Sequence, residues 1–203
     1  MSVFTYEARD TEKQLETWEW DNTWWEHTEN QTATRFLYIG DSISCRVRHF
    51  LTEMSGEKIL CDGFGTSKGL DNPHFQASID LFMAQQGKCD VILFNNGLHG
   101  WHLTAEEYET YYDKMLSFLA QKGKPVYILL TTNEISNPKR GPVIDARNAA
   151  ARKLAEKYGF PVIDLHTIAK NNLDCYSPDG VHFIDRGYEL LAKCILEATG
   201  YGF

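Results

Sequence analysis

The stretch that decides the fold is Phe36-Leu-Tyr-Ile-Gly-Asp-Ser-Ile-Ser-Cys-Arg46. Its first four residues are a short apolar run that favours a strand, Gly40 interrupts that run, and an amphipathic segment that predicts a helix follows to about Met54. A strand that turns at once into a helix places the next hydroxyl at the carboxyl edge of a sheet and on a helix N-terminus. Ser42 is therefore a candidate nucleophile, because free N–H groups at that position can stabilise an oxyanion.

A second interpretation of Ser42 needs no chemistry, since serine is a common N-cap residue. The far end of the chain favours the catalytic interpretation. The run Tyr176-Ser-Pro-Asp-Gly-Val-His-Phe183 places Asp179 and His182 in one loop just before a final helical pattern. Histidine is the usual base for a serine nucleophile, and a carboxylate on its other nitrogen fixes its tautomer. The alternative is that Asp179 caps the last helix and that His182 is an ordinary residue at its start.

The two blocks together resemble the SGNH, or GDSL-type, hydrolase superfamily. The family's first block, Gly-Asp-Ser-x-Ser, stands here as residues 40–44, and its last block, Asp-x-x-His, stands as residues 179–182. The resemblance covers about Arg35 to Leu196. It implies a catalytic triad of Ser42, His182 and Asp179, no cofactor, and a serine esterase for short-chain esters. Acetyl esters of carbohydrates are the best single expectation for the substrate.

The second block of the family departs from the expected pattern. The resemblance implies three kinds of oxyanion donor: the N–H of Ser42, a glycine N–H in this block and an asparagine in the third block. The second block is Gly63-Phe-Gly-Thr-Ser-Lys-Gly69, which lacks the asparagine that accompanies the family's glycine. Either Gly63 or Gly65 could be the donor, and Gly65 is preferred. The glycines could equally serve turn geometry alone.

The third block, Asn95-Asn-Gly-Leu-His-Gly-Trp-His102, departs further. His99 stands where the family has its asparagine, and glycine follows where the family has aspartate. Asn96 or His99 could be the donor, and Asn96 is slightly favoured because an amide donates at every working pH. His99 and His102 could also be a metal pair, but no acidic or cysteine ligand joins them at the usual spacing, so we expect no metal.

Strand and helix patterns alternate along the rest of the chain. Strands are predicted at 36–39, 58–62, 90–96, 126–132 and 160–165, and helices at 43–54, 73–86, 104–121, 143–158 and 184–198. The order predicts an α/β protein with a five-stranded parallel sheet and helices on both faces. This agrees with the three-layer α/β/α, flavodoxin-like fold that the resemblance implies. Ligands of such sheets bind at the carboxyl ends of the strands, where each of the motifs lies.

Residues 1–34 are a polar, acidic segment that we predict as an N-terminal arm on a catalytic domain of residues 35–203. The arm carries four tryptophans, Trp18, Trp20, Trp24 and Trp25. Their rings could pin the arm to the domain, which is the simpler interpretation. Alternatively, one or two rings could line the substrate cleft, because flat aromatic faces suit sugar rings. Candidate substrate-binding residues are Trp24, Trp25 and Trp101.

Composition narrows the class of protein further. A length of 203 residues suits one domain with a sizeable core, and the formal net charge of -8 argues against a nucleic-acid partner. The five cysteines have no framework or zinc-site spacing. No stretch is long enough to span a bilayer, and the first ten residues lack a signal-peptide pattern, so we expect a cytoplasmic protein without a membrane partner.

Two other functions fit the same motifs. An acyltransferase of this fold would pass the acyl group to a sugar rather than to water. A non-catalytic carbohydrate-binding module would keep the fold and the motifs by descent, and the unusual third block is its best argument. The intact candidate triad argues against such a module. The sequence predicts no oligomeric state.

Overall fold

Strand β2 (Thr34–Gly40) lies inside a six-stranded sheet in the computed structural model, which describes residues 19–201. The strand order is β1-β3-β2-β4-β5-β6. The remaining strands are β1 (Asp21–Trp24), β3 (Ile59–Thr66), β4 (Val91–Phe94), β5 (Val126–Leu129) and β6 (Val162–Ile163). Strands β2 to β6 pair in parallel, whereas β1 pairs with β3 in the antiparallel direction. All five predicted strands are therefore present, and β1 is a sixth.

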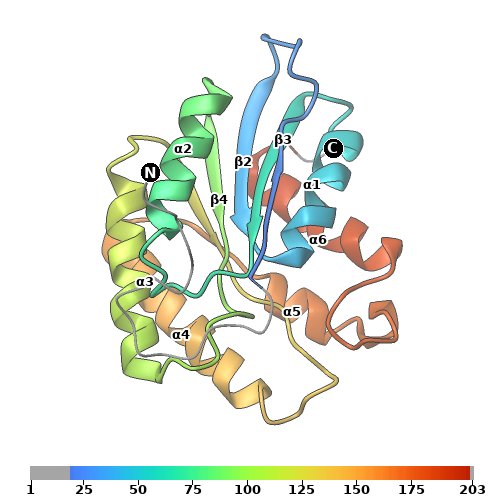
Figure 1. The fold of residues 1–203 in the computed structure, drawn as a ribbon. Coiled ribbons are helices and arrows are strands. Elements are labelled where there is room, and N and C mark those ends of the chain that lie inside the picture. The colour runs from blue at the N-terminus through green and yellow to red at the C-terminus, as the bar shows by residue number, and fades with distance from the viewer. Residues whose placement is uncertain (1–18, 202–203) are drawn as a thin grey trace.

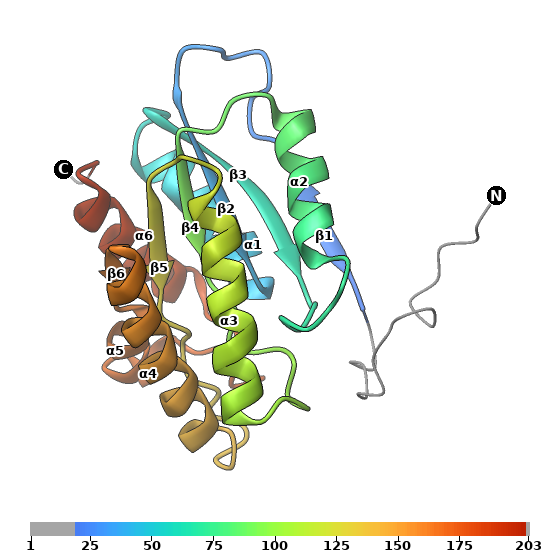
Figure 2. The ribbon, with the colours of Figure 1, turned by 90° about the vertical axis from the view of Figure 1, so that its left-hand side faces the viewer.

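Helices cover both faces of the sheet, which confirms the predicted three layers. On one face lie α1 (Ser42–Met54), α5 (Leu165–Lys170) and α6 (Asp185–Thr199), and on the other lie α2 (Phe75–Gln86), α3 (Ala105–Ala120) and α4 (Gly141–Tyr158). Figure 1 shows these two sets on the right and left of the sheet, and Figure 2 views α2 and α3 in front of it. A short 3-10 helix, η2 (Leu173–Cys175), precedes the last loop.

The apolar run of β2 divides between the two layers because side chains alternate along a strand. Phe36 and Tyr38 belong to the core cluster under α1 and α6, whereas Leu37 and Ile39 belong to the cluster under α2 and α3. A strand covered on both faces needs this continuous apolar pattern, which is why β2 is readable from the sequence. Among residues 19–201, no helix has the length and apolar character that crossing a membrane requires.

Strand β1 changes the predicted second block. Its four residues are exposed and show no apolar alternation, so the sequence gives no sign of a strand. Its backbone nevertheless pairs with residues 63–66, where a loop was predicted, and β3 therefore continues to Thr66. The loop prediction is wrong for these residues, because backbone pairing with the arm satisfies their hydrogen bonds. The sequence patterns also overestimate β5 and β6, and α5 begins where a strand was predicted to end.

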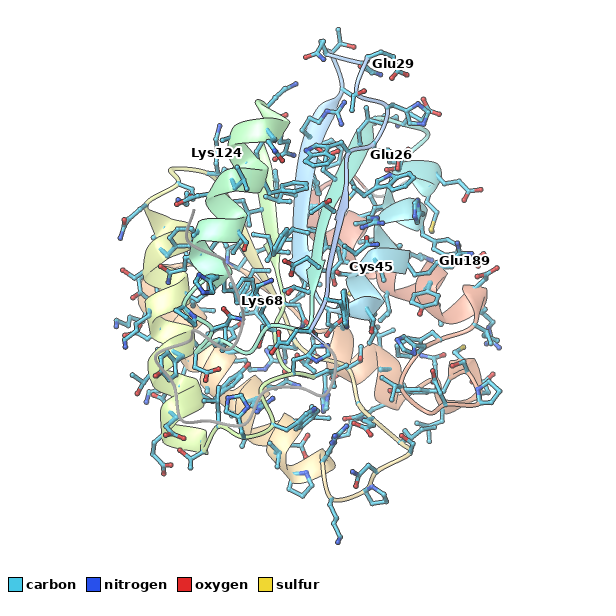
Figure 3. The ribbon with its side chains drawn as sticks, in the orientation of Figure 1. Glu26, Glu29, Cys45, Lys68, Lys124 and Glu189 are labelled. Atoms are coloured by element: carbon cyan, nitrogen blue, oxygen red, sulfur yellow. The ribbon has the colours of Figure 1, made fainter. Side chains whose placement is uncertain are left out.

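The parallel strands end at one edge of the sheet, at the bottom of Figure 1, and the segments that carry the motifs follow these ends. Figure 3 labels Cys45 in the first turns of α1 and Lys68 just after β3, which both lie towards this edge. The helix that starts after the third block opens with a capping box of Thr104 and Glu107. The candidate site is therefore assembled at the carboxyl edge, as a doubly wound sheet requires.

Candidate active site

Ser42 is the first residue of α1, and its neighbour Asp41 is the N-cap. The Asp41 carboxylate accepts a hydrogen bond from the N–H of Ile43 at 2.9 Å, and the Ser44 hydroxyl donates to the Asp41 carbonyl at 2.6 Å. The interpretation of Ser42 as a helix cap is therefore wrong, because Asp41 takes that role. The Ser42 hydroxyl is free to take part in chemistry at the helix N-terminus.

His182 lies beside Ser42 although the two are 140 residues apart in the chain. Its Nε2 is 2.7 Å from Ser42 Oγ, and its Nδ1 is 2.6 Å from Asp179 Oδ2. With the imidazole proton on Nδ1, Nε2 can accept the serine proton, which is the geometry that a serine nucleophile needs. Both the histidine and the aspartate are partly exposed, so a substrate can reach them.

Asp179 is held by hydrogen bonds within its own loop. Its Oδ1 accepts from the N–H groups of Val181 and His182, each at 2.9 Å, and from the Ser177 hydroxyl at 2.7 Å. Burial raises the pKa of Asp179, but the hydrogen bonds from His182, Val181 and Ser177 together hold that pKa well below its ordinary value. The carboxylate is therefore ionised and oriented. The N-cap of α6 is Ile184, so the interpretation of Asp179 as the cap of the last helix is wrong.

The loop after β5 supports the Asp179–His182 turn. The N–H of Ile135 donates to the carbonyl of Gly180 at 2.8 Å, and the Tyr176 hydroxyl donates to the Asn133 carbonyl at 3.0 Å. Gly180 has φ of 70°, and a Cβ there would lie 2.8 Å from the nitrogen of Ser136. Glycine is required at that position both by its backbone conformation and by this close approach.

Gly65 packs against the start of α1, where Ser42 lies. It pairs with Gly40 of β2 and Asn22 of β1, and an added Cβ would meet Cys45 Sγ at 2.2 Å and the Asp41 carbonyl oxygen at 3.5 Å. An added Cβ at Gly63 would instead meet the Arg48 guanidinium, two turns into α1. Of the two candidate glycines, Gly65 is therefore the one beside the nucleophile block.

Asn96 lies buried at the end of β4. Its Nδ2 donates to the Lys68 carbonyl at 3.1 Å, and its own carbonyl accepts a hydrogen bond from the Tyr108 hydroxyl. An amide carries two N–H donors, and within residues 19–201 the second has no acceptor among the hydrogen bonds of the structure. The preceding Asn95 is different, because its Nδ2 donates to both the Leu129 carbonyl and the Thr131 hydroxyl. Asn95 therefore serves the structure, and Asn96 keeps a donor.

His99 lies beside the nucleophile block. It is close enough to Asp41 to oppose the effect of burial on the pKa of that carboxyl, and its ring meets Trp20 edge-on with centroids 6.1 Å apart. His99 thus lies near the nucleophile block, and Asn96 lies at the other end of the same short loop, bonded to Lys68 and Tyr108. The other histidine of the block, His102, bonds to Asp71 at 2.9 Å. In the described part of the chain, no group of three or more His, Cys, Asp or Glu side chains is placed to hold a metal.

Trp24 and Trp25 pack against helices of the domain, whereas Trp20 lies beside the candidate active site. Trp25 stacks on Phe82 of α2 with centroids 4.7 Å apart, and Trp24 lies against Arg48 and His49 of α1. Trp20 is the ring of the arm beside the site, since its Cζ3 would lie 3.6 Å from a Cβ at Gly65. Trp18 lies outside the described residues.

Trp101 has two guanidinium groups over its ring, those of Arg140 at 4.1 Å and Arg147 at 4.8 Å. Such stacking holds the ring in one orientation. Sequence reasoning did not single out Trp20, Tyr108 or Arg147 as site residues. The irregular tryptophan spacing and a mid-helix arginine carry no local signal of a contact with a loop so distant in the chain.

A model of the GDSL-like lipase/acylhydrolase family matches residues 65–190, which is more than half of the chain. That range includes Gly65, the third block, Asp179 and His182, and begins after Ser42. Comparison with curated proteins found no match.

Solved structures share the fold. An acetyl xylan esterase superposes with a TM-score of 0.66 at 19% identity over 81% of this chain and 98% of its own. An acetyl xylan esterase from Geobacillus stearothermophilus gives 0.61 at 17% identity over 86% and 99%. The C-terminal catalytic domain of peptidoglycan O-acetyltransferase A from Streptococcus pneumoniae, with a methylsulfonyl adduct, gives 0.65 at 21% identity over 83% and 93%. At these identities the likeness establishes the fold alone.

The buried cap residue gives a prediction about stability. Burial raises the pKa of Asp41 above its ordinary value of 3.8, against the opposing effects of His99 and of the backbone N–H groups. The folded state therefore keeps the Asp41 proton to a higher pH than the unfolded state does. The stability that this difference in protonation contributes is lost as the pH rises from 3.8 through the raised pKa of the folded state. Asparagine caps helices as well as aspartate does, without the charge. The free energy of unfolding can be measured with urea for Asp41→Asn and for the wild type. The value for Asp41→Asn minus the value for the wild type should rise through this pH window and level off above it. A difference that does not change with pH would contradict the assignment.

Proposed function

The chain belongs to the GDSL-like lipase/acylhydrolase family, and from that premise we propose that it is a serine esterase that removes short acyl groups from carbohydrates. The observation that carries the proposal is the line of hydrogen bonds from Ser42 through His182 to Asp179, at 2.7 and 2.6 Å. If these residues served only to pack the core or to solvate the surface, they would not need this alignment of hydroxyl, imidazole and ionised carboxylate.

Each group has a definite role in the proposed reaction. As Ser42 Oγ forms a bond to the ester carbonyl carbon, its proton passes to Nε2 of His182, and Asp179 stabilises the imidazolium. The tetrahedral intermediate then collapses, and the C–O bond to the sugar breaks while His182 returns the proton to the leaving oxygen. Water, activated by the same histidine, attacks the acyl-enzyme and releases the free acid.

The oxyanion of the intermediate needs donors that are fixed before the reaction. The N–H of Ser42 belongs to the unsatisfied first turn of α1. Gly65 lies against the Asp41 carbonyl, but its backbone pairs with Asn22 of β1, so this proposal assigns its N–H to the sheet and not to the oxyanion. Asn96 supplies the other donor through the N–H that its bond to Lys68 leaves over. His99 is the alternative to Asn96.

Support for a carbohydrate substrate comes from two sides. Two of the structural neighbours are acetyl xylan esterases. In this chain, the arm brings the Trp20 ring to His99, where a flat face lies beside the nucleophile block. An acyltransferase is the second candidate, because a neighbour with the same fold is a peptidoglycan O-acetyltransferase domain. Product analysis with and without a sugar acceptor separates the two: hydrolysis releases acetate, and transfer yields an acetylated acceptor.

Removal of either end of the proton relay should abolish turnover. On p-nitrophenyl acetate and on acetylated xylan, Ser42→Ala and His182→Ala should each lower kcat by about three orders of magnitude or more, because the nucleophile and its base act as one unit. The double variant should be little worse than either single variant. Asp179→Asn should cost less, since Asp179 only orients and stabilises the imidazole.

Ser44→Ala is a matched control for Ser42→Ala, because it removes a neighbouring hydroxyl that donates to the Asp41 carbonyl. It should keep most of the activity. Losses that add up in the Ser42 and His182 double variant would show that the two do not cooperate. Binding of the polysaccharide without any turnover by the wild type would favour the non-catalytic module.

The oxyanion donor of the third block can be identified by substitution. If Asn96 fills this role, Asn96→Ala should lower kcat by about a hundredfold or more with little change in KM, because such a donor acts on charge that develops in the transition state. If His99 is the donor, His99→Ala should show this loss instead, and Asn96→Ala should lower stability rather than kcat. Asn95→Ala is the control, since both its amide donors are used within the fold. Unchanged kcat in both the Asn96 and His99 variants would exclude this loop from the oxyanion hole.

A further inference from the structure

Arg147 is a buried arginine of α4, with only 3% of its surface exposed. Its guanidinium donates hydrogen bonds to the loop of the third block. Its Nη1 donates to the carbonyl of Gly97 at 2.9 Å and to that of His99 at 2.7 Å. Its Nη2 donates to the carbonyl of Gly100 at 2.7 Å. One side chain therefore fixes three backbone carbonyls within four consecutive residues of the third block.

Two aromatic rings hold the guanidinium in this position. It lies 4.6 Å from the ring centre of Tyr108 and 4.8 Å from that of Trp101. The Tyr108 hydroxyl in turn donates to the backbone carbonyl of Asn96. Asn96 directly precedes the segment whose carbonyls Arg147 binds. Helices α3 and α4 thus hold the loop backbone from Asn96 to Gly100 through side chains that are themselves stacked on each other.

The loop is also held closely on its other side. An added Cβ at Gly97 would lie 1.9 Å from Thr131 Oγ1, so the loop backbone presses directly on the end of β5. His99 and Gly100, two of the residues whose carbonyls Arg147 holds, are the two positions at which the chain departs from the family's third block. The backbone there is therefore fixed from α4.

We propose that Arg147 is a positioning residue for ester hydrolysis, which acts by holding the loop from Asn96 to Gly100 so that its donor points at the oxyanion. The inference rests on the proposed esterase function and adds a residue to it. The hydrogen bonds that define this role go from Arg147 to backbone carbonyls of the loop. Its effect passes through the third-block donor, and displacement of a catalytic group by about 1 Å can cost about a hundredfold in rate.

Lysine cannot replace this guanidinium, because a single ammonium group lacks the planar fork that reaches three carbonyls and stacks on two rings. Arg147→Lys keeps the positive charge and most of the length of the side chain, so it isolates geometry from charge. Arg152→Lys is the matched control: it makes the same change in the same helix, at a half-exposed arginine paired with Asp164.

The first test measures the kinetics of p-nitrophenyl acetate hydrolysis. The concentration of active enzyme is determined by active-site titration, so that unfolded protein does not lower the measured kcat. Arg147→Lys should lower kcat by about tenfold to a hundredfold with KM nearly unchanged, as expected for misplacement of a transition-state donor. Arg152→Lys should match the wild type. An unchanged kcat per titrated site in Arg147→Lys, whatever its melting temperature, would overturn the proposal.

The second test is a double-mutant cycle. If Arg147 acts through Asn96, Arg147→Lys should cost little when Asn96 is already alanine, so the double variant should resemble Asn96→Ala alone. The same result with His99→Ala in place of Asn96→Ala would identify His99 as the group that Arg147 positions. Fully additive losses in both cycles would mean that Arg147 affects the rate by another route and would refute the proposal.

The third test is chemical rescue, which a general loss of stability would not show. Arg147 lines a pocket of about 350 Å³ between the first turns of α3 and α4, together with Leu103, Tyr108 and Val143. Millimolar methylguanidinium should enter this pocket in Arg147→Ala and restore part of kcat, whereas methylammonium should not. Equal effects of both ions would count against the proposal. Failure of the esterase proposal is distinguishable, because the wild type and Ser42→Ala would then have equal activity.

Discussion

The turn from β2 into α1 is the constraint on which the rest of the site depends. No side chain fits at Gly40, where a Cβ would lie 2.7 Å from that of Ser44, and the buried Asp41 carboxylate caps the helix from inside. Because Asp41 takes the cap, the Ser42 hydroxyl is left for His182. A larger residue at Gly40 would move the helix start and, with it, the nucleophile.

Two loops and the end of β3 converge on this turn at the same edge, and each is supported by a neighbour that is distant in the chain. The Asp179–His182 turn bonds to the loop after β5 through Gly180. The third block is held by Arg147 of α4. Gly65 is part of a strand because β1 pairs with it from the outside. The geometry of the site is therefore a property of the whole carboxyl edge rather than of the motifs alone.

Much of this arrangement can be predicted from the sequence where the signal is local. The apolar run of β2, the glycine that ends it and the helical pattern after it predict the first strand and helix, and two short blocks suffice to select Ser42, Asp179 and His182. Strand β1 could not be predicted, since a polar edge strand owes its existence to backbone pairing with β3.

Sequence patterns also could not predict the contacts between side chains and backbone that is distant in the chain. The role of Arg147 depends on carbonyls about 50 residues earlier in the chain, and carbonyls leave no trace in residue types. Four tryptophans mark the arm in the sequence, but their spacing alone could not show that Trp20 lies beside His99 while Trp25 stacks on Phe82.

Activation of Ser42 as a nucleophile by His182 can be measured by covalent labelling of the serine. The protein would be treated with phenylmethanesulfonyl fluoride, digested, and analysed by mass spectrometry alongside His182→Ala. One sulfonyl group per chain is expected, on Ser42, with loss of esterase activity in proportion to labelling, and no labelling of His182→Ala at the same exposure. Loss of activity with Ser42 unmodified, or equal labelling of Ser42 when His182 is absent, would contradict activation of Ser42 by His182.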